Sequence, residues 1–113
     1  MTQQRDDLPR TFQKFTERFP ELRDAHQAIA QLADKAGSLS RRECELIKMG
    51  ICMGAGLESA FRSHVRRAME HGATIGEVEQ AVVLAMTTVG FPRTAAAWQW
   101  AHKQIAHDRD GES

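Results

Sequence analysis

The chain has 113 residues, and its 15 Lys and Arg residues balance its 15 Asp and Glu residues. Zero formal net charge argues against a nucleic-acid-binding surface, because phosphate binding needs an excess of positive charge. No apolar run reaches the roughly 18 residues of a membrane span, no signal peptide is visible, and two cysteines indicate no disulfide framework. We therefore expect a cytoplasmic protein with one domain over residues 1–113 and with no nucleic-acid or membrane partner.

The first third of the sequence predicts two helices after a polar tail over residues 1–9. Three phenylalanines recur at spacings of three and four in "RTFQKFTERF", which favours a short amphipathic helix. Pro20 can begin a second helix, since proline is tolerated in a first turn. Gly37 is its expected C-cap. The apolar face of this second helix consists of Leu22, Ala25, Ile29, Leu32, Ala33 and Ala36.

The middle of the chain predicts a third and a fourth helix. "SRRE" is a capping-box pattern, with Ser40 as the cap and Glu43 three residues later. The third helix that it begins is expected to end at the glycines of residues 54–56. The fourth helix lies in "LESAFRSHVRRAMEHGAT" and is expected to end at Gly72. His64 stands out because it is an ionisable residue in the middle of that helix's apolar stripe.

The last part predicts two more helices. "TIGE" at Thr74 to Glu77 is a second capping box and begins a helix that is apolar on almost every side up to Gly90. So small a domain cannot cover every side of this helix, so we expect part of the cover to come from another copy of the chain. The final helix is expected to bury Trp98, to leave Trp100 at an interface or partly exposed, and to end before a polar tail over residues 108–113. No strand alternation is present, so the predicted fold is an all-α bundle of about six helices.

Four pieces of this pattern, "ELI", "SHVRRAMEHGAT", "GEVEQAVVLA" and "GFPRTAAA", together resemble the carboxymuconolactone decarboxylase family, which includes the alkylhydroperoxidase-D-like proteins. The similarity covers about residues 39–101. It implies an all-helical domain with an antiparallel helix pair at its centre. It also implies a homo-oligomer, commonly a trimer or a hexamer, with a pocket for a small molecule near the subunit contacts.

The peroxidase branch of this family uses Cys-x-x-Cys-x-x-x-His and a glutamate on the preceding helix. The resemblance places the histidine at His64 and the cysteines at Leu57 and Ala60, so both sulfurs are absent. The remaining Cys44 and Cys52 are eight residues apart on one helix, roughly 12 Å along its axis, which is too far for a disulfide. A peroxiredoxin label inherited from the family is therefore not supported by these residues.

The resemblance also implies the candidate catalytic residues of the decarboxylase branch, namely His64 and a glutamate. Glu45 in "ELI" matches that glutamate, and Glu43 is close enough to compete. A histidine can deliver the proton that follows decarboxylation, and nearby cations can hold carboxylates and an enolate. The candidate substrate-binding residues are Arg42, Arg62, Arg93 and Cys52. No cofactor is expected, and no metal either, because His102 and His107 are poorly spaced for ligands on one helical face.

Three functions follow as hypotheses, in decreasing order of support. The first is a decarboxylase-like lyase that transfers protons on a small carboxylated or lactone substrate. The second is a non-catalytic oligomeric module of the same fold, which binds a small molecule or a protein. The third is thiol chemistry through Cys52. Structural explanations stand beside these hypotheses: His64 as a packed histidine with one hydrogen bond, Glu45 as a first-turn glutamate that favours the helix dipole, and Cys52 as core packing.

Overall fold

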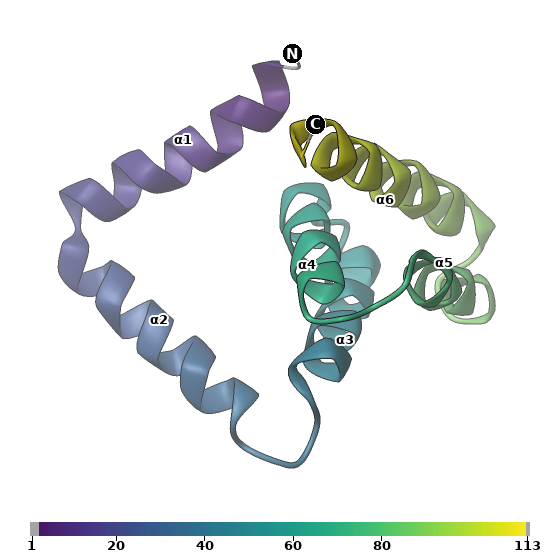
Figure 1. Ribbon diagram of the computed structural model, residues 1–113, viewed down its shortest axis with the longest axis horizontal. Coiled ribbons are helices and arrows are strands. Elements are labelled where there is room, and N and C mark those ends of the chain that lie inside the picture. The colour runs from purple at the N-terminus through teal and green to yellow at the C-terminus, as the bar shows by residue number, and fades with distance from the viewer. Residues whose placement is uncertain (1–2, 113) are drawn as a thin grey trace. The chain divides into compact units, whose positions relative to one another are not determined.

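The computed structural model describes the backbone of residues 3–112 and the side chains of residues 10–111. Over these residues the chain forms six α-helices and one short 3₁₀ helix, without a strand, which confirms the predicted all-α class (Figure 1). Contacts divide the chain into two units, one ending at Leu39 and the other beginning at Ser40. The single domain expected over residues 1–113 stays a prediction.

The first unit contains α1 (Gln3–Arg18) and α2 (Pro20–Asp34). The polar tail expected over residues 1–9 is wrong for residues 3–9, which are helical; residues 1 and 2 lie outside the described part. Polar residues such as Gln and Arg favour a helix even where no apolar stripe marks it, so apolar periodicity does not reveal such a segment. Pro20 begins α2 as predicted, but the helix ends at Asp34 with Lys35 as its cap, before Gly37.

The apolar face predicted for α2 is exposed in the part of the chain that the structure describes. None of the residues of α2 is buried. Ile29 and Leu32 expose 64 and 71% of their surface. Helices of this length are stable in proteins mainly through the packing of such a face, so α2 offers an unburied apolar stripe.

The second unit is built around α3 (Arg41–Ala55) and α4 (Glu58–Glu70), which pack against each other. Ser40 caps α3 in the predicted capping box. The helix ends at Gly56, whose φ of 74° is a left-handed conformation that glycine adopts without strain. Because α4 starts two residues later and Glu45 contacts His64, the two helices run antiparallel. Gly72, with a φ of 100°, follows α4 as predicted.

Three further elements complete the second unit: α5 (Ile75–Val83), the 3₁₀ helix η1 (Leu84–Thr87) and α6 (Phe91–Glu112). Thr74 forms the second predicted capping box at the start of α5. The α-helix expected to continue to Gly90 instead tightens into η1 at Leu84. Only one side of this segment packs inward. Its buried residues include Val78, Val82 and Ala85, whereas Val83, Leu84, Met86 and Val89 are exposed.

The last helix differs from the sequence prediction at its end and in its tryptophans. The polar tail expected over residues 108–113 is helical as far as Glu112, and Ser113 lies outside the described part. Trp98 is exposed, whereas Trp100 packs its ring edge-on to Phe61 at a centroid distance of 5.8 Å. Trp100 thus packs against the core formed by α3, α4 and α6. The sequence alone does not show which face of α6 turns inward, and in the structure this face is the one that contacts α4.

Candidate active site at the Glu45–His64 pair

The antiparallel packing of α3 and α4 brings Glu45 and His64 together. Nδ1 of His64 lies 2.6 Å from Oε1 of Glu45. The side chain of Glu45 is 1% exposed and that of His64 is 16% exposed. The second carboxylate oxygen of Glu45 accepts a hydrogen bond from Nη2 of Arg41 at 3.2 Å, one helical turn earlier. Glu45 is therefore a buried carboxylate held between an imidazole and a guanidinium.

Glu45 remains ionised in this environment. Burial alone raises the pKa of its carboxyl group, but the hydrogen bonds from His64 and Arg41, together with the charges of His64 and Lys48, outweigh burial, so that the pKa is lowered overall. An ionised carboxylate only accepts hydrogen bonds. Nδ1 of His64 must therefore carry the proton that it shares with Glu45.

The other ring nitrogen of His64 has no protein partner among the described residues. The buried side-chain nitrogen and oxygen atoms that lack a hydrogen bond there comprise only Nε of Arg66. Nε2 of His64 is thus neither hydrogen-bonded by a described side chain nor buried as an orphan. An imidazole fixed through Nδ1 with a free Nε2 can act as a general acid or base.

The structure decides which of the two competing glutamates faces His64. Glu43 completes the capping box of α3, where its Oε1 accepts a hydrogen bond from the backbone N–H of Ser40 at 2.8 Å. Hydrogen bonds with the backbone and hydroxyl of Ser40 lower the pKa of Glu43. Glu43 therefore caps the N-terminus of α3, and Glu45 is the partner of His64.

The other candidate residues do not converge on this pair. Arg42 pairs with Glu77 at 2.9 Å, and Arg62 donates to the side-chain oxygen of Gln104 at 3.1 Å. Arg93 donates to the backbone oxygen of Met53 at 2.7 Å and thereby closes the end of α3. Cys52 is buried in the core, where burial raises the pKa of its thiol.

Arg41 is the cation that sequence reasoning missed. It lies four residues before Glu45, so that the two side chains share a face of α3, whereas Arg42 is turned about 100° away. The i, i+4 spacing of Arg41 and Glu45 was the available signal. The sequence prediction named Arg42 instead, and Arg42 pairs with Glu77.

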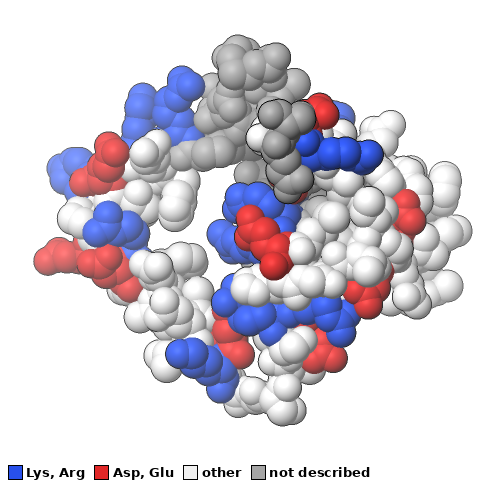
Figure 2. All heavy atoms as spheres, in the orientation of Figure 1, with Lys and Arg blue, Asp and Glu red and all other residues white. Residues whose placement is uncertain are grey.

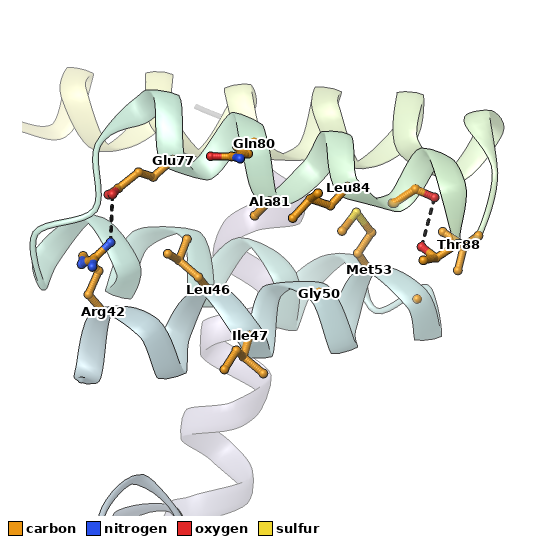
Figure 3. Close-up of a pocket in the computed structure, with 13 residues that line it drawn as sticks. Arg42, Leu46, Ile47, Gly50, Met53, Glu77, Gln80, Ala81, Leu84 and Thr88 are labelled. Atoms are coloured by element: carbon orange, nitrogen blue, oxygen red, sulfur yellow. Dashed lines mark hydrogen bonds and ion pairs between the residues drawn. The ribbon is translucent and has the colours of Figure 1, made fainter. Parts of the chain in front are cut away.

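A separate groove lies between α3 and the α5–η1 segment, with a volume of about 520 Å³. Figure 3 shows Arg42 and Glu77 paired at one end and apolar side chains along both walls. Its lining includes Leu46, Ile47, Met53 and Leu84, together with Gly50 and Gly54. Of the predicted binding residues Arg42 lines this groove, and neither His64 nor Glu45 does.

The described residues lack two other features. No group of three or more His, Cys, Asp and Glu side chains there could hold a metal ion. Nor does any helix there have the length and apolar character needed to cross a membrane. On the face drawn in Figure 2, positively and negatively charged residues are interspersed.

These elements place the chain in the class of all-helical proteins, with an antiparallel helix pair that joins buried Glu45 to His64. Within that class, the chain belongs to the carboxymuconolactone decarboxylase family, which it matches over residues 20–103. The match extends the sequence resemblance toward the N-terminus, so that it includes α2 as well as α3 to most of α6. No curated protein and no solved structure matches the chain.

The lowered pKa of Glu45 predicts a specific dependence of stability on pH. A carboxyl group with a folded-state pKa below its unfolded value stabilises the fold above the unfolded pKa, and this contribution is lost as pH falls through the folded pKa. In urea unfolding between pH 7 and pH 3, we expect wild type to exceed Glu45→Gln in stability at pH 7 and to lose that advantage in acid. A difference that stays constant over this range would contradict the assignment.

Proposed function

We propose that the chain is a decarboxylase-like lyase that transfers a proton on a small carboxylated or lactone substrate. His64 is the acid–base residue, and Glu45 positions it. The observation that carries this proposal is the 2.6 Å contact between Nδ1 of His64 and buried Glu45, which leaves Nε2 available to a bound molecule.

The chemistry of a decarboxylation fits this pair. When the bond to the carboxylate carbon breaks, carbon dioxide leaves and its electron pair spreads onto a neighbouring carbonyl as an enolate. A proton from Nε2 of His64 then forms the new C–H bond. Glu45 stabilises the protonated imidazole before this step and fixes its ring through Nδ1. Arg41 donates to the second oxygen of Glu45 and so helps to hold this carboxylate in place.

A non-catalytic module of the same fold is the second candidate, and one observation favours it. Arg62 and Arg93 are engaged with Gln104 and with the end of α3, so they do not gather around His64. A ligand-binding protein needs no convergent cations at an imidazole. The two candidates differ in whether a bound lactone or carboxylate is chemically changed.

Two experiments in sequence separate these candidates. Thermal-shift screening of the purified protein first identifies stabilising compounds among small lactones and carboxylates, beginning with carboxymuconolactone. Each stabilising compound is then incubated with the protein and followed by NMR. The lyase proposal expects a bound compound to lose carbon dioxide or to exchange protons. Binding without any chemical change would favour the non-catalytic module.

The cysteines give a further prediction. Peroxide reduction needs a thiolate and a resolving thiol, but burial raises the pKa of Cys52, and Cys44 lies eight residues away on the same continuous helix. We therefore expect no reduction of an organic peroxide by dithiothreitol that depends on Cys44 or Cys52. We also expect Cys44→Ser and Cys52→Ser to leave turnover of the lyase substrate within a few fold of wild type, once their folding is checked by circular dichroism. Reduction of an organic peroxide by dithiothreitol that either variant abolishes would defeat this prediction.

A further inference from the structure

Arg41 occupies a position where the helix itself does not favour a cation. It is the first residue of α3, directly after the cap Ser40, and the N-terminal end of a helix stabilises negative rather than positive charge. Its Nη2 donates to Oε2 of Glu45 at 3.2 Å, although 47% of the Arg41 side chain stays exposed. Helix stability therefore does not explain a cation here, whereas the contact with the buried carboxylate does.

The 2.6 Å contact between Nδ1 of His64 and Oε1 of Glu45 holds a proton that either side chain can carry. When the pair takes up a second proton, it is either an imidazolium beside a carboxylate or a neutral imidazole, protonated at Nε2, beside a neutral carboxyl group. The two forms contain the same protons and differ only in which atom holds the one between the side chains. Burial favours the neutral form, because the Glu45 side chain is only 1% exposed and a low-dielectric surrounding penalises charge.

We propose that Arg41 is the positioning residue that keeps this pair in its charged form. A guanidinium stabilises a carboxylate more than a neutral carboxyl group, so the shared proton stays on Nδ1. The groups that act on this carboxyl are His64 from α4 and Arg41 and Lys48 from α3. Burial raises the pKa of Glu45 and the contact with His64 lowers it, and beyond that contact the hydrogen bond from Arg41 lowers this pKa more than the charge of Lys48 does.

The charged form decides whether Nε2 of His64 can give up a proton. An imidazolium releases a proton near neutral pH, whereas the N–H of a neutral imidazole is far too weak an acid. In the charged form, transfer of the Nε2 proton to an enolate carbon leaves a neutral imidazole with its proton on Nδ1, beside an ionised Glu45. This consequence rests on the proposed function, but the position of the shared proton is measured without any substrate.

Histidine labelled with ¹⁵N in the full chain tests the proposal, because long-range ¹H–¹⁵N NMR spectra show which ring nitrogens carry a proton. His64→Gln identifies the signals of His64 by their loss. On acidification, the wild-type ring is expected to pass from a proton on Nδ1 alone to protons on both nitrogens. In Arg41→Met the same step is expected to exchange the tautomers instead, with a proton on Nε2 and none on Nδ1, because methionine offers Oε2 no donor.

Arg41→Lys and Arg42→Met are the matched controls. Lysine keeps a cation four residues before Glu45, and Arg42 pairs with Glu77 at 2.9 Å rather than with Glu45 (Figure 3). Both are expected to give the wild-type pattern. Helical circular dichroism should stay unchanged in all three variants, since lysine and methionine favour a helix about as well as arginine does. An Arg41→Met protein whose ring still takes up protons on both nitrogens in that step would overturn the proposal.

Turnover gives a second readout that separates this inference from the proposed function. If no lactone or carboxylate is converted, the proposed function fails, and the NMR pattern of the variants still decides where the proton lies. With a lyase substrate in hand, Arg41→Met is expected to lower kcat at least about ten-fold and to keep KM within about two-fold, because Arg41 acts through Glu45 rather than on the substrate. A wild-type kcat in Arg41→Met would contradict the role of Arg41.

Discussion

Replacing His64 by glutamine is expected to lower kcat/KM by about 10²–10⁴-fold, the usual contribution of a positioned general acid or base. Glutamine approximates the size of the ring and can still donate to Oε1 of Glu45, so the buried carboxylate keeps a partner. It cannot release or take up a proton near neutral pH. The loss is therefore expected in turnover, while helical circular dichroism and the unfolding midpoint change little.

His102 provides the matched control for this experiment. It too is a histidine bonded to a glutamate, with Nε2 3.0 Å from Oε2 of Glu79. This pair is far more exposed, at 38 and 33% of the side chains, and the ring of Trp98 packs beside the imidazole. His102→Gln is expected to keep kcat/KM within about two-fold. Equal losses in the two variants would show that the effect is not specific to the buried pair.

Phe61→Ala is expected to cost about 3–5 kcal/mol of the free energy of unfolding, the range for deleting a buried aromatic ring. Phe61 is fully buried one turn before His64, and its ring meets the edge of Trp100 on α6. Alanine would leave a cavity where α3, α4 and α6 meet. At about 4–8 °C per kcal/mol for a domain of this size, the melting temperature should fall by more than about 12 °C.

Leu57→Ala is the control for the loss of a large apolar side chain from the same region. Leu57 stands at the N-cap of α4, with half of its surface exposed. Surface substitutions of this kind change stability by about 0.5 kcal/mol or less. Thermal unfolding of both variants checks the prediction, and a Phe61→Ala protein as stable as Leu57→Ala would contradict the core described for the second unit.

The parts of the fold that local interactions determine could be predicted from the sequence. Both capping boxes form as expected, because Ser40 and Thr74 reach only three residues along the chain. Gly56 and Gly72 adopt the left-handed conformations that end a helix. The contact between Glu45 and His64 could also be predicted, because the family resemblance links those two positions.

Features that depend on the exact rotation or extent of a helix could not be predicted. Successive side chains along α3 point about 100° apart. For this reason Arg41 pairs with Glu45, whereas Arg42 pairs with Glu77. The same ambiguity explains why the two tryptophans were predicted the wrong way round: Trp98 is exposed, and Trp100 packs against Phe61. Polar helical ends carry no apolar periodicity, so both terminal segments were mistaken for tails.

Deuterium incorporation is the most direct test of whether His64 transfers a proton to carbon. The stabilising lactone or carboxylate, carboxymuconolactone first, is incubated in D₂O with wild type, Glu45→Gln and His64→Gln, and the C–H signals are followed by NMR. Wild type is expected to deliver deuterium to the carbon that bears the enolate, Glu45→Gln to do so more slowly, and His64→Gln no faster than the solution without protein. Incorporation by His64→Gln at the wild-type rate would contradict the proposed role of this histidine.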